Sequence, residues 1–446
     1  MSKQLHRALL LACGGALSAG AAAGPYLFGT AVRQGDNVAG VGLVTSIDNL
    51  AINNKGQWFV EVDTNGADTN TDGALLSGTG YGSGFSLFIR EGDQLGLPAG
   101  VSVDSFDAVT INNNGDGGFN FFLGGLPTSQ DSGVFFNTTM VIQEGFVSGA
   151  AGFSPNTPYI GWFETRINDS NQIMMMASVD DPAIPTTVDR AIVVIDTDGA
   201  GGLVAEKVYL KEGDQIAGQG VTDFGTGPHS MAFNNAGQMM FVADLDGATT
   251  SDGLVGIANG DNVAILAQEG TASGIQGRNW GTLPTSTAVA LNDNGDWAMR
   301  ATLAGDTTTD TVIVRNGEVV AQEGFGHASI GGFVFTSFGT GAIDMDNHGN
   351  VLYYGDWDDP NTLMDTGLFL NDQLIVQEGV TLIDGLVVTG ISAVQDNFAI
   401  SDNGRWIIFE GTLAGGISGA FIIQIPAPGG AALIGLAGLA GLRRRR

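Results

Sequence analysis

A turn signature recurs along this chain and constrains the fold more than any other feature. An apolar residue is followed by Asn, Asp or Ser, two variable residues and Gly, and then by another apolar run; the first copy extends from Ile52 to Val60. Seven copies follow one another at spacings of 54 to 66 residues, and such a period indicates a repeat architecture. The seven turns begin at Asn53, Asn112, Asn168, Asn234, Asn292, Asp346 and Ser401.

The residues of the signature are those of a hairpin turn. The leading Asn, Asp or Ser can accept a hydrogen bond from its own backbone two residues on, and the closing Gly supplies a positive φ. The third copy has Asn171 in place of the glycine. Because Asn is the other residue that tolerates the left-handed region, this exception also fits a turn.

A second signature, an apolar strand that ends in Glu-Gly, alternates with the first. Its glutamates are Glu91, Glu144, Glu212, Glu269, Glu323 and Glu378, and Gln34-Gly35 is a seventh, variant copy. Their regular place at strand ends favours a structural role over a ring of catalytic acids. We expect their carboxylates to bind backbone amides where the next repeat begins.

The sixth repeat illustrates the unit. Strands are expected over 341–345, 351–357, 368–370 and 374–377, and four strands repeated seven times are typical of propeller blades. The seventh repeat lacks the strand that ends in Glu-Gly, whereas residues 26–34 form an extra one at the start. The sequence therefore predicts an all-β, seven-bladed β-propeller over residues 24–425, whose ring is closed by an N-terminal strand. Another repeat-based β fold is the alternative.

The N-terminal segment predicts export. Lys3 and Arg7 precede an apolar, small-residue stretch over 8–23, and Ala23 offers a cleavage site, so residues 1–23 are expected to be a signal peptide. A buried helix is the other interpretation. The single cysteine, Cys13, weakly matches a lipoprotein cleavage box; with cleavage after Ala23 the mature protein has no cysteine and no disulfide.

The C-terminal segment, 426–446, predicts a sorting signal. Pro426-Ala427-Pro428 leads into a short apolar run that is followed by a terminal cluster of arginines, Arg443, Arg444, Arg445 and Arg446. The run is shorter than the roughly 20 residues of a relaxed membrane span, and the arginines hold the cytoplasmic end. This order resembles PEP-CTERM signals, with Ala427 where that motif has glutamate. The resemblance implies export machinery, transient membrane contact through the tail and a sorting protease, an exosortase. A retained C-terminal anchor is the alternative.

The charge of the chain restricts the classes of molecule that it can bind. Six of the 17 basic residues and none of the 47 acidic ones lie in the two end segments, which leaves a net charge of −36 between them. Such a surface repels nucleic acid and anionic lipid and favours cations or cationic partners. Solubility outside the cell is the simpler explanation of the acidity.

The repeats are also similar to the NxxGxxAF-type tandem-repeat family of bacterial surface proteins. The resemblance rests on the seven turns, and Phe241 and Phe409 fit its aromatic position, where other copies have Met299 or Tyr353 nearby. It implies only a surface protein without an assigned function.

One loop has the spacing of a calcium site. Asp68, Asn70 and Asp72 precede Gly73 in an Asp-x-Asn-x-Asp-Gly pattern, in which alternate oxygens can converge on a cation. The position of the expected bidentate acid is occupied by Thr79. A solvated Asx-rich hairpin loop is the other interpretation, and no further cofactor is expected.

No catalytic constellation stands out. The histidines of the mature chain, His229, His327 and His348, occupy different positions in their repeats, which argues against shared metal ligation, and no serine or cysteine triad or phosphate loop is found. We therefore expect an exported, non-enzymatic surface or matrix protein whose propeller is a structural or binding module for envelope glycans or proteins. The alternative is an extracellular glycan-binding or glycan-cleaving propeller, which would need two carboxylates facing each other near the axis.

Overall fold

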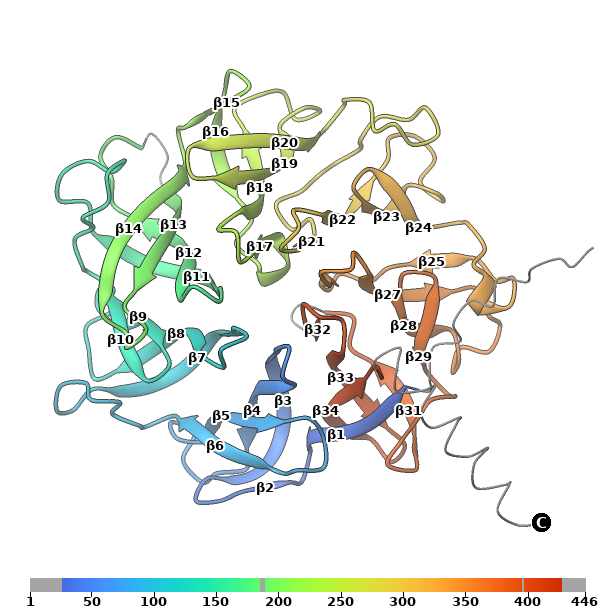
Figure 1. Ribbon diagram of the computed structural model, residues 1–446, viewed down its shortest axis with the longest axis horizontal. Helices are drawn as coiled ribbons and strands as arrows, with labels where there is room; N and C mark the ends of the chain where they lie inside the picture. The colour runs from blue at the N-terminus through green and yellow to red at the C-terminus, as the bar shows by residue number, and fades with distance from the viewer. Residues whose placement is uncertain (1–25, 185–188, 395–396, 427–446) are drawn as a thin grey trace, which may run out of the picture. The chain divides into compact units, whose positions relative to one another are not determined.

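The computed structural model describes residues 26–184, 189–394 and 397–426, and in these the chain forms β-strands and two single-turn 3-10 helices. Residues 27–424 form one compact unit of seven antiparallel sheets arranged around an axis (Figure 1). The predicted all-β, seven-bladed propeller is confirmed. The predicted signal peptide (1–23) and the predicted sorting signal, except Pro426, lie outside the described residues. Among the residues that the structure describes, no helix is long and apolar enough to cross a bilayer.

Each blade is one sheet, numbered here in chain order. Blade 1 contains β2 (Asn37–Val38), β3 (Gly42–Ile52), β4 (Gln57–Thr64), β5 (Gly73–Thr79) and β6 (Phe85–Arg90). Blade 2 contains β7 (Ser102–Ile111), β8 (Gly117–Gly124), β9 (Ser132–Phe136) and β10 (Thr139–Gln143). Blade 3 contains β11 (Tyr159–Ile167), β12 (Gln172–Val179), β13 (Asp189–Thr197) and β14 (Leu203–Lys211). Blade 4 contains β15 (Gln215–Ile216), β16 (Gln219–Phe224), η1 (Pro228–Ser230), β17 (Met231–Phe233), β18 (Met239–Leu245), β19 (Gly253–Asn259) and β20 (Asn262–Gln268).

The remaining blades follow the same plan. Blade 5 contains β21 (Val289–Leu291), β22 (Trp297–Thr302), β23 (Thr311–Arg315) and β24 (Glu318–Gln322). Blade 6 contains η2 (Ala328–Ile330), β25 (Phe335–Ser337), β26 (Ile343–Met345), β27 (Val351–Trp357), β28 (Thr366–Leu370) and β29 (Gln373–Gln377). Blade 7 contains β30 (Leu382–Ile383), β31 (Leu386–Ile391), β32 (Phe398–Ile400), β33 (Trp406–Leu413), β34 (Ile417–Gln424) and β1 (Leu27–Arg33).

The ring is closed by strands from both ends of the unit. β1 pairs antiparallel with β34, with Leu27 opposite Gln424 and Arg33 opposite Gly419, and thus becomes the last strand of blade 7. The predicted closing strand is therefore confirmed. This pairing fills the strand position that blade 7 would otherwise lack, and β1 becomes the edge strand of that sheet.

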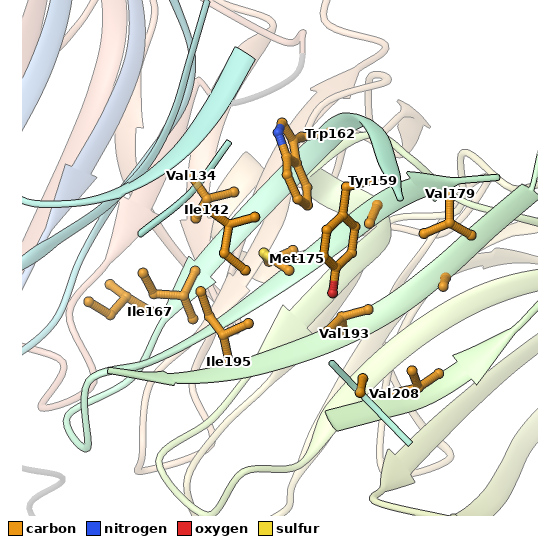
Figure 2. Packing of buried hydrophobic residues seen from close by; sticks show 14 of the residues in the cluster. Val134, Ile142, Tyr159, Trp162, Ile167, Met175, Val179, Val193, Ile195 and Val208 are labelled. Carbon is orange, nitrogen blue, oxygen red and sulfur yellow. The ribbon is translucent and has the colours of Figure 1, made fainter. Parts of the chain in front are cut away.

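The hydrophobic core consists of layers between neighbouring blades. In β12, alternate side chains enter two different layers: Ile173 and Met175 pack with side chains of blades 2 and 3, whereas Met174 and Met176 pack with blade 4. Figure 2 shows the first of these layers, with Val134 and Ile142 of blade 2 against Met175 and Val193 of blade 3. Because both faces of a central strand are covered, its residues are almost all apolar.

The Glu-Gly pairs mark the passage from one blade to the next, but the glycine makes the contact between blades. Gly92 has a φ of 84°, and its N–H donates to the backbone oxygen of Val103 in blade 2 at 2.8 Å. The same bond recurs at Gly35, Gly145, Gly213, Gly270, Gly324 and Gly379.

The glutamates bond mainly within their own blades. Glu91 accepts from the Gly73 N–H at 2.8 Å, in its own blade. Glu269 reaches a backbone amide of the next blade, where it accepts from the Leu283 N–H at 2.7 Å. The expected role of the glutamates therefore fits Glu269, and in the other contacts the glycine performs it.

Candidate functional site along the propeller axis

The leading asparagine of five turns connects its blade to the next. Asn53 accepts from the N–H groups of Lys55 and Gln57, both at 3.0 Å, which is the predicted turn. Its amide nitrogen donates to the backbone oxygen of Asn112 in blade 2, at 2.9 Å. The same bond to the following turn is made by Asn112 at 3.0 Å, Asn168 at 3.3 Å, Asn234 at 2.8 Å and Asn292 at 3.0 Å.

The second residue of each turn adds a parallel series of bonds. The Asn54 N–H donates to Oδ1 of Asn113, and the Asn113 N–H donates to Oδ1 of Asp169, at 2.9 and 2.7 Å. The series continues through Asn235, Asp293 and Asn347. Blade 7 returns to blade 1 through the Asn403 N–H, which donates to Oδ1 of Asn54 at 2.6 Å. We call these seven turns the turn ring; it surrounds one end of the axis, where a space of about 80 Å³ lies among the turns.

A cavity of about 230 Å³ continues along the axis from the turn ring. The residue two positions before each turn lines this cavity in all seven blades. These residues are Ala51, Thr110, Arg166, Ala232, Ala290, Asp344 and Ala399. Five have small side chains, which leave room near the axis, and two are charged.

The two charged residues are held by partners within the protein. Arg166 forms an ion pair with Glu164 and donates to the backbone oxygens of Thr165 and Pro228. Asp344 accepts from the Ile400 N–H at 2.8 Å. Burial raises the pKa of Asp344 to about 7, and its hydrogen bonds and the positive charge of Arg166 oppose that rise.

The axial cavity adjoins a groove of about 610 Å³, because Glu164, Pro228 and His229 line both. We call it the axial groove. Its other lining residues are Asp107, Phe122, Trp162, Phe163, Thr226, Gly227, Ser230, Thr285 and Ser286, from blades 2, 3 and 4 and from the segment leading into blade 5. The turn ring thus surrounds one end of the axis, and away from it the axial cavity continues into the axial groove.

Two buried groups of the axial groove have unmatched hydrogen-bonding atoms. His229 is 3% exposed, and its Nε2 lies 2.9 Å from the Ser286 oxygen. Since a carbonyl only accepts, Nε2 carries the proton and Nδ1 is an acceptor. Neither His229 Nδ1 nor Trp162 Nε1 has a hydrogen-bond partner among the described residues. Burial lowers the pKa of His229, and the nearby Arg300 and Arg166 lower it further, so the imidazole is neutral.

Carboxylates gather where blades 1 and 2 border this end of the axis. Asn49 donates to Glu61 Oε2 at 2.8 Å and to the Asp107 backbone oxygen at 3.1 Å. Asn120, which is fully buried, donates to Asp107 Oδ2 at 2.8 Å. Burial raises the pKa of Glu61 to about 8, and Asp48, Asp63 and Asp107 add to the rise. Burial also raises the pKa of Asp107.

The predicted calcium loop is an exposed Asx turn. Oδ1 of Asp68 accepts from the backbone and the amide nitrogens of Asn70, at 3.1 and 3.0 Å. Asp72 lies close enough to Glu91 to raise the pKa of that carboxyl, after the larger effect of burial. Among the described residues, no three His, Cys, Asp or Glu side chains are placed to hold a metal ion. Calcium binding by Asp68, Asn70 and Asp72 stays a prediction.

The histidines do not come together in the structure. His229 lies in η1 of blade 4, whereas His327 precedes η2 and bonds Ser329 through Nδ1 at 2.7 Å. His348 belongs to the turn of blade 6 and lies 3.8 Å from Asp346. The sequence did not predict that His229 lines the axial groove.

The sequence matches a family described as "Family of unknown function (DUF7453)" over residues 21–262, which is just over half of the chain. The chain belongs to DUF7453. The DUF7453 match includes the closing strand β1, blades 1 to 3 and part of blade 4, and it therefore contains the residues of the axial groove up to Ser230. No curated protein matches the sequence.

Solved structures with a similar arrangement have very different sequences. A puromycin-hydrolyzing peptidase of Mycobacterium tuberculosis is 9% identical, with a TM-score of 0.45 over 91% of this chain and 55% of that one. The Dos1 propeller is 10% identical, with a TM-score of 0.41 over 89% and 96% of the two chains. A Trypanosoma rangeli sialidase is 8% identical, with a TM-score of 0.33 over 86% and 55%. The chain spans about half the length of the peptidase, and these similarities concern the fold alone.

Sequence reasoning missed the residues of the axial cavity and the axial groove, although one signal was available. The position two residues before each turn is small in five repeats and charged in two, which distinguishes Arg166 and Asp344. The position five residues before the turn supplies Asp107, Phe163 and His229 to the axial groove. Counting backwards from the turns would have found both sets.

Proposed function

We propose that this protein is an exported cell-surface or matrix protein whose propeller is a non-enzymatic binding module, with the axial groove as its ligand site. The seven repeats keep the same residue types in the turn ring but differ where the axis continues into the groove. The described residues five positions before the turns are Asp48, Asp107, Phe163, His229, Thr287 and Gly341. The residue types are thus constant at the turn ring and variable at the axial groove, and variation confined to one end of the axis supports a recognition role for that end.

The polar groups at the axial groove support binding rather than catalysis. Glu164 is 3% exposed and pairs with Arg166, and Asp107 accepts from Asn120. Carboxylates held in this way are positioned to fix the orientation of a ligand. The strongly acidic chain, with a net charge of −30, further favours neutral or cationic partners over nucleic acid.

The binding role can be tested with the purified full chain. Envelope polysaccharides and envelope proteins from the source cells are immobilised separately, and binding is measured for the wild type, Phe122→Ala and Phe146→Ala. The two phenylalanines are 39% and 42% exposed, but only Phe122 lines the axial groove. Loss of binding in Phe122→Ala with retention in Phe146→Ala supports the proposal. Equal binding by all three proteins contradicts it.

Export and sorting form the second half of the proposal. It rests on the N-terminal apolar segment and on the Pro426, Pro428 and arginine pattern of the tail. We expect the mature protein to begin at Gly24 and to reach the surface through export machinery and a sorting protease. Mass spectrometry of the cell-surface fraction tests this, with a variant in which residues 443–446 are alanines as the comparison. An intact N-terminus in the cytoplasm contradicts it.

Glycan cleavage is the second candidate function, because Asp107 and Glu164 both line the axial groove. Paired carboxylates near a sugar can act as acid and base or nucleophile. The test is release of reducing ends from envelope polysaccharide by the wild type and by Asp107→Asn and Glu164→Gln. Release that is lost in both variants favours the enzyme, and absence of release favours the binding module.

A further inference from the structure

The axial groove combines three kinds of surface that a sugar uses. Phe122 is 39% exposed and presents an aromatic surface, with Trp162 and Phe163 as further aromatic lining. Asp107 and Glu164 supply acceptors, and Thr226, Thr285 and Ser286 supply hydroxyl or backbone groups. A volume of about 610 Å³ lies within the usual range of small-molecule sites.

Unmatched polar atoms beneath this surface point to a ligand. Trp162 is 6% exposed and its Nε1 is a donor without a partner among the described residues. Figure 2 shows this nitrogen on the side of the indole ring turned away from Tyr159 and from the aliphatic layer. His229 Nδ1 is an acceptor in the same situation. Native proteins rarely leave such groups unmatched. Both atoms are covered by neighbouring groups, so a ligand hydroxyl, or a water held beneath a ligand, would satisfy them once the covering side chains shift.

The charges of the groove disfavour an anionic ligand. Its lining contains two carboxylates and no lysine or arginine. Arg166 lines the axial cavity instead, where Glu164 and two backbone oxygens take up its donors. An acidic saccharide or an acidic peptide would therefore meet repulsion without a compensating cation.

We propose that the axial groove binds a neutral saccharide, whose apolar ring face packs on Phe122 and whose hydroxyls bond Asp107 and, directly or through water, Trp162 Nε1 and His229 Nδ1. This inference rests on the proposed binding function and names its ligand class. An aromatic face takes up the C–H side of a sugar, and a mixture of donors and acceptors suits its hydroxyls.

The test is calorimetric titration of the purified full chain with three neutral tetrasaccharides, of glucose, mannose and N-acetylglucosamine, and with tetragalacturonate as the anionic probe. We expect at least one neutral probe to bind and tetragalacturonate to bind at least about tenfold more weakly. Phe122→Ala should weaken the neutral probe by about tenfold or more, as for an aromatic anchor. Trp162→Phe, which keeps an aromatic ring and removes the N–H, should weaken it about threefold to tenfold. Phe146→Ala, exposed outside the groove, should bind as the wild type does.

Each contrary result has a distinct meaning. Binding of a neutral probe that Phe122→Ala and Trp162→Phe leave unchanged overturns the inference, as does preference for tetragalacturonate or absence of binding by all neutral probes. If Phe122→Ala nevertheless abolishes binding of envelope protein or acidic polysaccharide, the groove is a binding site of another class and only the saccharide is wrong. If no envelope fraction depends on Phe122, the proposed function falls too.

Discussion

Asn113 of blade 2 donates a hydrogen bond from its amide nitrogen to Oδ2 of Asp402 in blade 7, at 2.6 Å, although blade 1 lies between these blades in the ring. The turn of blade 7 is one residue longer than the others. In blade 1 the Asn53 N–H donates to the backbone oxygen of Gln57, four residues on, whereas in blade 7 the Ser401 N–H donates to the backbone oxygen of Trp406, five residues on. Burial raises the pKa of Asp402 to about 6, and Asp293, Asp169 and Asp346 add to the rise.

The contact between Asn113 and Asp402 should be energetically coupled. In a double-mutant cycle with Asn113→Ala and Asp402→Ala, urea unfolding at pH 7.5 should give an interaction free energy of about 1–2 kcal/mol, since the acceptor is then ionised. At pH 5 the carboxyl is protonated and the coupling should decrease. Additive single effects at both pH values would contradict this prediction.

The turn ring should depend on its buried asparagines. Asn112 is 3% exposed; its Oδ1 accepts from three backbone N–H groups, and its Nδ2 donates to blade 3. Asn112→Ala should lower the free energy of unfolding by about 2–4 kcal/mol, because buried backbone groups lose their partners. The exposed Asn262→Ala in β20 should change it by less than about 0.5 kcal/mol. Similar values for both variants would show that the turn ring does not hold the blades together.

The glycines of the second signature, including Gly35 of its variant copy, should be required because they adopt a positive φ. Gly35 has a φ of 89°, and a Cβ there would meet no atom within 4 Å. Gly35→Ala should therefore cost about 1 kcal/mol through backbone strain alone. Gly149→Ala is the matched control, because Gly149 is equally open but does not have the positive φ. Thermal unfolding measures both, and equal melting temperatures would contradict the prediction.

Stability should fall as the pH rises from 5 to 8. The pKa of Glu61 is about 8 in the folded protein, whereas a glutamate in the unfolded chain titrates near 4. The folded state therefore holds the extra proton across this interval, and the free energy of unfolding decreases by up to about 1.4 kcal/mol per pH unit for this group. Glu61→Gln should flatten the curve while leaving the melting temperature at pH 5 nearly unchanged. A curve as steep as that of the wild type would contradict the assignment.

Ring closure by β1 should be detectable by cross-linking. Leu27 and Gln424 are opposite each other at the start of the β1–β34 pairing. In a Cys13→Ser background, Leu27→Cys with Gln424→Cys should form a disulfide within one chain and raise the melting temperature by several degrees. Non-reducing gels distinguish this from dimers. Disulfides between chains only would mean that β1 completes a neighbouring molecule.

The fold could be predicted because its signals recur. The turn of Asn53 returns in each blade, and even Asn171 adopts the expected positive φ, of 60°. In blade 6, the strand expected over 351–357 is observed as β27 (Val351–Trp357), and β1 supplies the missing strand of blade 7. Each of these predictions was local, because it rested on residues that determine a turn or a strand without contacts from the rest of the chain.

The site could not be predicted in the same way. Counting back from the turn finds His229, but Phe122 and Trp162 come from two different blades and from positions that the turn spacing does not mark, so only the closed ring brings them together. Short strands such as β2, β15 and β30 were also missed, because they form where the chain passes between blades. The hydrogen bond between Asn113 and Asp402 depends on the one additional residue in the turn of blade 7, and the sequence does not show where that residue places Asp402.

The most direct test of the account is hydrogen–deuterium exchange of the full chain with and without the envelope fraction that it binds. If the axial groove is the ligand site, exchange should slow at residues 226–230 and 285–286 and stay unchanged on the outer strands β6, β14 and β24. Slower exchange on those outer strands, with the groove unaffected, would contradict the assignment of the axial groove as the binding site.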